Sequence, residues 1–213
     1  MHQILKDALE PLSYLIYFIT ILLALKTNRS PQVMVLLFYY LLAIPLICSA
    51  VFIINVSRNV AIYNSFFFLT ICVFSYYFHS ILFNSFRKVI IVIIFIINLG
   101  LFIGFDLLHG GLIKVHTPFY AITYLSVVIY SLVYFEQVMS NVSEMNLLLQ
   151  FNFWLVSGYL LYYFGSFFII LFYDNVEIND RAIIWSLQNV ILFISSVLTL
   201  SGSLWISRHR QFS

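Results

Sequence analysis

Residues 33–83 read VMVLLFYYLLAIPLICSAVFIINV, then SRN, then VAIYNSFFFLTICVFSYYFHSILF. Each of the two long runs has the length of about 20 apolar residues that a helix needs to cross a bilayer. The runs are continuously apolar, whereas the strands of a membrane barrel alternate in polarity over about ten residues. Because only Ser57, Arg58 and Asn59 separate them, the runs are predicted to form a tight antiparallel pair of transmembrane helices.

The same pattern extends along the rest of the chain. Of the 213 residues, 63% are hydrophobic and 8% are charged, against about 25% charged residues in soluble domains. Such a chain has too few charges to cover a water-soluble surface. We therefore predict an all-α membrane bundle of seven transmembrane helices, in a single domain over residues 1–213. The expected spans are residues 9–25, 33–56, 60–83, 89–105, 119–135, 152–173 and 182–205.

Prolines mark several helix starts and one expected irregularity. Pro11, Pro31 and Pro118 lie at or just before the first turn of a run, where a missing backbone N–H costs little. Pro45 lies inside the second run, so the sequence predicts a kink there.

The distribution of Lys and Arg predicts the orientation in the membrane. The set of helix ends with more cations is expected in the cytoplasm. This gives an N-terminus outside, a cytoplasmic C-terminus and a multi-pass protein of the cell inner membrane. The richer set is Lys26, Arg29, Arg87, Lys88, Arg208 and Arg210, and the poorer set is Lys6, Arg58, Lys114 and Arg181.

Charge and motifs exclude several classes of function. The formal net charge of +2 is small and scattered, so the lipid bilayer is the expected partner and a nucleic acid is not. Cys48 and Cys72 fall within spans and give no disulfide framework. No complete catalytic, metal or cofactor motif is present, so we predict no enzyme activity, no cofactor and no metal.

Small residues predict where helices touch. In lipid, glycine and hydroxyl residues mark helix contacts, so the last span is expected to pack inside the bundle through one small and polar face. That face is Gln188, Asn189, Ser195, Ser196, Thr199, Gly202 and Ser203. Gly158 with Gly165, and Gly100 with Gly104 at GxxxG spacing, predict further close contacts. Packing within the monomer is favoured over a dimer contact.

Two groups of residues are candidates for ligand binding. Tyrosines near helix ends are typical of the interfacial aromatic belt, but Tyr130 and Tyr162 lie mid-span and need hydrogen-bond partners. They are predicted to line a polar pocket with Gln188 and Asn189, unless each bonds a neighbouring backbone. The second group is Asp106, His109 and His116, where a carboxylate and an imidazole share a helical turn and are candidates to bind a proton or a metal, or are simply solvated.

Ser75 and His79 have the spacing seen in zinc-dependent membrane hydrolases of the alkaline ceramidase type. The last span has no His or Asp, so a three-ligand zinc site cannot be assembled by that pattern. We interpret His79 as a hydrogen-bonded polar residue near the cytoplasmic interface and keep a metal-dependent hydrolase as the least favoured alternative.

The cytoplasmic ends are the expected docking point for a partner. Glu136 ends the fifth span and leads into residues 137–146, which mix apolar and polar side chains and are predicted to form a short amphipathic helix. The docking residues are expected to be Glu136, Glu144, Arg208 and Arg210.

Two seven-helix classes do not fit. The last span has no Lys for a retinal Schiff base, as in rhodopsins. The Pro-Gln pair of PQ-loop carriers occurs once, at Pro31-Gln32, and in a loop, with no convincing internal repeat. A small-solute transporter with a polar pocket between the fifth and seventh spans remains the alternative function.

Three stretches carry a resemblance to a known group of proteins. They are Glu10-Pro11-Leu12, residues 126–136, and residues 152–165, which read NFWLVSGYLLYYFG. Through them the chain resembles bacterial seven-helix membrane proteins that are similar to the membrane sensor modules of histidine kinases. The resemblance implies a receptor-like sensor or regulatory module that binds a small molecule or lipid and signals to a cytoplasmic kinase or regulator.

Overall fold

The computed structural model describes residues 2–27, 30–52, 56–104, 117–140, 148, 150–177 and 181–210. Within these ranges the chain is helical and contains no strand. The elements are α1 (His2–Thr27), α2 (Pro31–Phe52), α3 (Val56–Ile81), α4 (Ser85–Phe102), α5 (Thr117–Ser140), α6 (Phe151–Phe172), the short 3₁₀ turn η5 (Tyr173–Asn175) and α7 (Arg181–Arg210).

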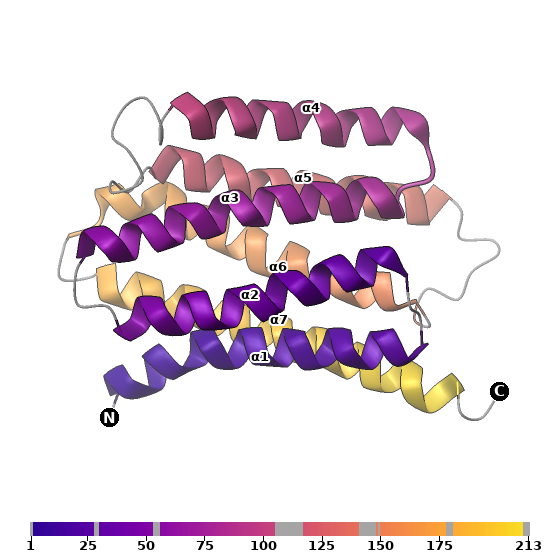
Figure 1. Ribbon diagram of the computed structural model, residues 1–213, viewed down its shortest axis with the longest axis horizontal. Helices are drawn as coiled ribbons and strands as arrows, with labels where there is room; N and C mark the ends of the chain where they lie inside the picture. Colours follow the sequence, from indigo (N-terminus) through magenta and orange to yellow (C-terminus); the bar gives the residue numbers. More distant parts are fainter. Residues whose placement is uncertain are drawn as a thin grey trace.

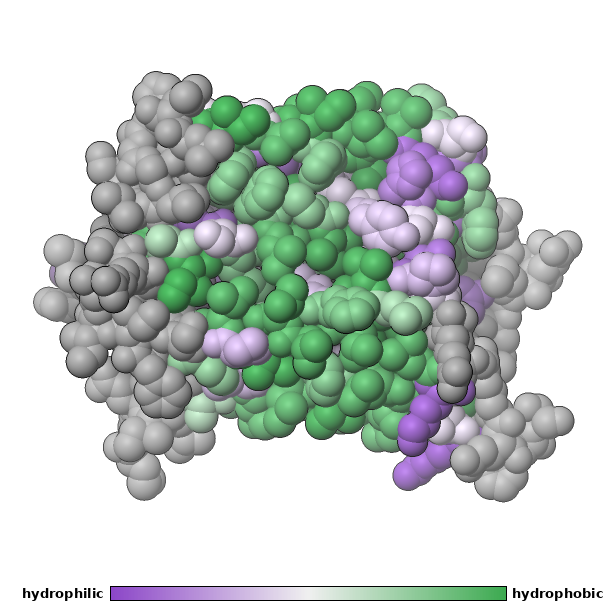
Figure 2. Space-filling model, viewed as in Figure 1, coloured by the Kyte–Doolittle hydropathy of each residue, from purple (hydrophilic) through white to green (hydrophobic). Residues whose placement is uncertain are grey.

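Seven helices in the described ranges are long and apolar enough to cross a membrane. They lie lengthwise beside one another, with the two termini at opposite ends of the bundle (Figure 1). Large apolar side chains cover the outside, and they form a broad hydrophobic band in Figure 2. Soluble proteins rarely expose a continuous apolar surface of this extent. The fold is therefore that of a multi-pass membrane protein.

The helices form a closed ring with one helix outside it. Around the ring, α1 packs on α2, α2 on α3, α3 on α5, α5 on α6 and α6 on α7, and α7 packs on α1 to close it. Helix α4 lies outside, against α3 and α5 (Figure 1). Only 17% of the residues in the α4 span are buried, against 61% of those in the α5 span. Helix α4 therefore lies at the edge of the bundle, and it covers α5 on the outside of the ring.

The helix boundaries differ from the predicted spans at two places. Helix α1 begins at His2, so Pro11 lies well inside the helix and not in its first turn. Residues 57–59 form the first turn of α3 instead of the connection to α2. Polar residues suit that position because the first backbone N–H groups of a helix have no partner within it. Helix α2 continues past Pro45, which faces outward.

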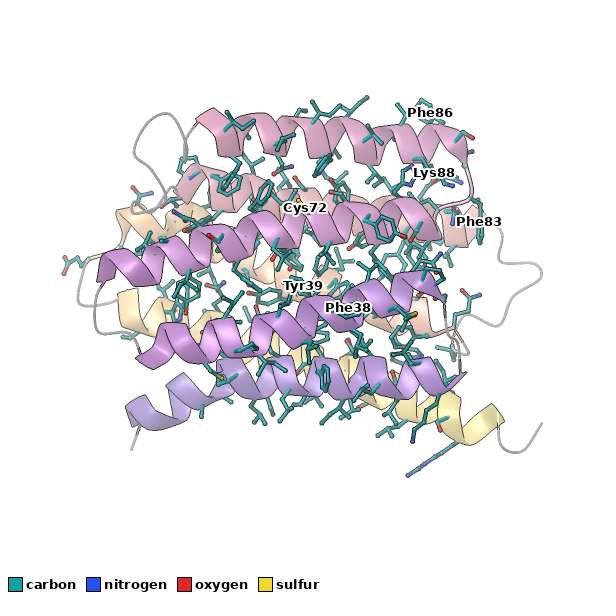
Figure 3. All side chains as sticks on the ribbon, in the orientation of Figure 1. Phe38, Tyr39, Cys72, Phe83, Phe86 and Lys88 are labelled. Carbon is teal, nitrogen blue, oxygen red and sulfur yellow. The ribbon has the colours of Figure 1, made fainter. Side chains whose placement is uncertain are left out.

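The core is built largely from tyrosines. Twelve of the 15 tyrosines are buried, and Tyr120 and Tyr134, which the sequence placed near helix ends, pack inside the bundle and not in an interfacial belt. Tyr39 is 3% exposed and lies between α2 and α3, while its neighbour Phe38 is 59% exposed (Figure 3). Alternate burial of this kind separates an interior rich in tyrosine from an exterior of apolar side chains without polar groups of this kind.

A tight turn joins α3 to α4 at the end of the bundle where the C-terminus lies. The Asn84 side chain caps α4 by accepting a hydrogen bond from the Phe86 N–H (2.8 Å). The buried Gln137 side chain on α5 accepts a second bond from the Phe83 N–H (2.8 Å). The turn is therefore fixed by two side-chain acceptors.

Replacing Asn84 with alanine is expected to destabilise the start of α4 by about 1 kcal/mol, because the Phe86 N–H loses its capping acceptor. Hydrogen exchange at the first amides of α4 measures the change. The neighbouring variant Ser85→Ala keeps the cap and should leave exchange unaltered. Equal exchange in both variants would contradict the capping role.

Candidate functional site

Three side chains from three helices form a buried polar cluster, which we call the central cluster: Tyr124 of α5, Tyr162 of α6 and Gln188 of α7. The Gln188 amide nitrogen donates to the hydroxyl oxygens of Tyr124 (2.7 Å) and Tyr162 (3.3 Å). The two hydroxyl oxygens lie 3.4 Å apart. The cluster thus joins the three helices at one point inside the apolar span.

The sequence of α7 explains why Gln188 points inward. Its small and hydroxyl residues share one face, which is buried against α1 and α6. Further along that face the Ser195 hydroxyl is 2.9 Å from the Tyr17 hydroxyl of α1. A short side chain every turn lets the backbones approach, and Gln188 is the long polar residue at the start of this face.

A small cavity of about 20 Å³ adjoins the central cluster. Its wall includes Glu10, Tyr14 and Asn189, and all three are buried. The Gln188 side chain is 4% exposed, and its amide oxygen has no hydrogen-bond partner among the described residues. A buried acceptor without a donor is costly, and the cavity has room for about one water-sized group.

Glu10 is a candidate site residue that the sequence analysis did not single out. It is 8% exposed and lies within the first apolar span. It lines the first cavity together with Tyr14, Tyr124 and Tyr162. The spacing of polar residues could have identified Glu10 from the sequence. Glu10, Tyr14 and Tyr17 follow the i, i+4, i+7 pattern of one buried helix face.

A second cavity of about 80 Å³, here named the aromatic pocket, lies beside the first. It sits at the end of the bundle formed by the starts of α3, α5 and α7 and the end of α6. Tyr63, Phe67 and Trp185 line both cavities. The Tyr63 and Trp185 rings meet edge to face (5.8 Å between centroids), and Phe67 stacks on Tyr120 (4.1 Å).

The predicted pocket residues do not all come together. Tyr162, Gln188 and Asn189 lie at the first cavity, but Tyr130 is elsewhere: its hydroxyl is 3.0 Å from the Ser75 hydroxyl and donates weakly to the Ile91 carbonyl (3.4 Å). Tyr130 therefore links α5 to α3 and α4. The second predicted group, Asp106, His109 and His116, lies outside the described residues.

The predicted glycine contacts divide into two classes. A Cβ on Gly158 would overlap the Thr199 hydroxyl, one on Gly202 would overlap the Trp154 ring, and one on Gly165 would lie 3.1 Å from Ile191. These three glycines allow α6 and α7 to pack closely. Gly100 and Gly104 differ from the prediction, since a Cβ there meets nothing within 4 Å. Gly100 lies on the peripheral helix α4, which the ring does not enclose, and Gly104 follows two residues after its end.

Of the predicted docking residues, Glu136 near the end of α5 and Arg208 near the end of α7 lie at the C-terminal end of the bundle. The Arg87 guanidinium of α4 donates two hydrogen bonds to the Glu136 carboxylate of α5 (2.5 and 2.7 Å). Glu136 is therefore engaged within the chain. Arg208 is exposed near the end of α7, Arg210 is described only as the last residue of that helix, and Glu144 lies outside the described residues.

Ser75 and His79 both line a groove between α3 and α4, together with Cys72 and Tyr76. His79 is exposed there, whereas Ser75 is buried and its hydroxyl lies 3.0 Å from the Tyr130 hydroxyl. In the ranges that the structure describes, no three His, Cys, Asp or Glu side chains are close enough to hold a metal ion.

The arrangement at the two cavities is suited to binding. It offers acceptor oxygens at the first cavity and aromatic rings at the second, which is the usual composition of a small-molecule site. Comparisons with models of protein families, with curated proteins and with solved structures found no match to this chain, so its function is inferred from this site alone.

Proposed function

We propose that the protein is a receptor-like sensor of the inner membrane, in which binding at the two cavities changes the packing of α7 and is read by a cytoplasmic kinase or regulator. The observation that supports this most is the central cluster itself. It joins α5, α6 and α7 through the single side chain of Gln188, with Glu10 of α1 nearby. A ligand that engages Gln188 therefore acts on several helix contacts together.

Helix α7 supplies a route from the site to the opposite end of the bundle. Gln188 lies near its start and Arg208 near its end. Between them the same face contacts α1 through Ser195, and it contacts α6 through Thr199, which lies against Gly158, and through Gly202, which lies against Trp154. With the C-terminus in the cytoplasm, a shift of α7 would reach the proposed docking surface around Glu136 and Arg208.

A small-solute carrier is the second candidate, because the polar cluster lies between α5, α6 and α7, where such a carrier would bind its solute. The size of the first cavity favours the sensor. About 20 Å³ admits a water-sized group but no path for a solute through the tyrosine core.

Photo-crosslinking separates the two candidates. A crosslinking residue at Met139, which is exposed at the end of α5, should capture one cytoplasmic protein in cells. We expect the yield to change several-fold in the Gln188→Leu variant, whereas Ser201→Ala, on the exposed face of α7, should leave it unchanged. Saturable counterflow of labelled solute in reconstituted vesicles, lost in Gln188→Leu, would replace the sensor with a carrier.

A further inference from the structure

We propose that an anionic phospholipid binds in the groove between α3 and α4, with its phosphate at Lys88 and His79 and one acyl chain along the groove. This inference goes beyond the sensor role, because the groove shares no lining residue with the two cavities. It assigns a membrane lipid to the outer face of the bundle, whereas the stimulus of the sensor is proposed to bind at the cavities.

The groove has the shape and the lining of a site for an acyl chain. Its volume is about 240 Å³, and it follows α3 for two turns, from Cys72 to His79, which is about 10 Å of helix length. On the α4 side it is lined by the apolar residues Ile91, Val92 and Phe95. Val92 is 43% exposed, so the groove opens to the outside of the bundle, where lipid chains lie.

Helix α4 is the helix that gains most from such a chain, because the ring does not enclose it. Toward its end, Phe102 stacks on Phe68 of α3 (4.3 Å between centroids), and the buried Asn98 amide donates to the Ser126 hydroxyl of α5 (2.7 Å). Toward its start, the groove lies between α4 and α3. An empty groove forfeits dispersion contacts on both walls, and an acyl chain supplies them.

A hydrogen-bond donor and a cation lie at the end of the groove next to the turn between α3 and α4. His79 lines the groove there and is exposed, and its imidazole carries at least one N–H donor in either protonation state. Lys88 lies four residues before Val92, and therefore on the same face of α4. Figure 3 shows Lys88 at the start of α4, and the antiparallel order of the two helices puts this position across from His79.

The charge of Lys88 is the reason for an anionic head group. Lys88 forms no ion pair with the residues that the structure describes, whereas its neighbour Arg87 is held by Glu136. The other carboxylates with described side chains, Glu10 and Glu177, lie toward the opposite end of the bundle. A lysine at a helix end extends its ammonium group to the membrane interface, where it attracts anionic lipids.

Native mass spectrometry measures the binding of single lipids to the purified full-length protein in detergent. The two probes are dioleoylphosphatidylglycerol, which is anionic, and dioleoylphosphatidylcholine, which has the same chains and a zwitterionic head. We expect the first phosphatidylglycerol molecule to bind about fivefold more tightly than the first phosphatidylcholine. Equal affinity for the two lipids would overturn the assignment of an anionic head group.

Variants at the start of α4 and the end of α3 test the residues at the phosphate. Lys88→Gln should remove the preference for phosphatidylglycerol. Lys26→Gln is the matched control, because it makes the same change of charge at the same end of the bundle but on α1, and it should keep the preference. His79→Leu should weaken both lipids several-fold through the lost donor to the phosphate.

Thermal unfolding of each variant verifies that it is folded. If Lys88→Gln and Lys26→Gln lose the preference alike, the lipid responds to the total charge of this end and the site is refuted. If Lys88→Gln is not folded, His79→Leu decides the question, and unchanged lipid binding in that variant refutes the site.

A substitution that fills the groove tests the position of the acyl chain. Val92→Phe should weaken the first phosphatidylglycerol several-fold, because the larger ring occupies the space of the chain. Ile96→Phe is the control, since Ile96 is 59% exposed on α4 and does not line the groove. Equal binding in these two variants would place the lipid elsewhere. Crosslinking at Met139 that depends on Gln188 tests the sensor role without any of these variants, so the two proposals fail independently.

Discussion

Replacing Gly158 with alanine is expected to destabilise the bundle by about 1–3 kcal/mol, the usual effect of overpacking. The added Cβ would overlap the Thr199 hydroxyl and lie 3.0 Å from the Ser195 backbone oxygen. The backbone of α7 cannot move away without disturbing the bond between Ser195 and Tyr17. Unfolding by SDS in mixed micelles, followed by circular dichroism, measures the change.

Gly100→Ala is the matched control, since its Cβ meets nothing within 4 Å. It should leave stability unchanged or raise it by up to about 1 kcal/mol, because alanine is the better helix former. Adding Thr199→Ala to Gly158→Ala should restore part of the loss by removing the overlapping hydroxyl. Equal stability of the Gly158 and Gly100 variants would mean that α6 and α7 do not approach as described.

Truncating Tyr159 to alanine is expected to cost still more, about 3–5 kcal/mol, as for other large aromatic residues in a core. Tyr159 is 1% exposed, and its ring lies 4.6 Å from Phe74 and 5.7 Å from Tyr17, centroid to centroid. The alanine variant would leave a cavity where α1, α2, α3 and α6 meet. The same unfolding experiment measures it.

Tyr159→Phe separates the ring from the hydroxyl. It removes only the acceptor for the Tyr40 hydroxyl (3.1 Å), and hydrogen bonds between helices in membranes contribute about 0.6 kcal/mol on average. A loss of similar size in the phenylalanine and alanine variants would show that the hydroxyl contact, and not the packing of the ring, carries the stabilisation.

The helix count and the packed face of α7 were predictable because both depend on patterns within one segment. Seven apolar runs predict seven helices whatever their order in space. The small and polar residues between Gln188 and Ser203 predict a face packed against other helices, because such residues are enriched at helix contacts in membranes. Burial of that face is as predicted.

The composition of the site was less predictable because it depends on which helices become neighbours. Glu10 lies at the start of the first apolar run, where the sequence does not show whether a side chain faces the bundle or the outside, and the structure buries it. Tyr130 and Tyr162 look alike in sequence but face different helices. The Gly100 and Gly104 pair has the spacing of a packing motif, but the helix that carries it lies outside the ring.

The closure of the ring between α1 and α7 also constrains biosynthesis. Glu10 enters the membrane with α1, whereas Gln188 and Trp185 arrive only with α7. Until then the inward face of α1, including a carboxylate, has to be sheltered by lipid, by earlier helices or by the insertion machinery. The two cavities are therefore completed late, since a nascent chain halted before α7 would lack both Gln188 and Trp185.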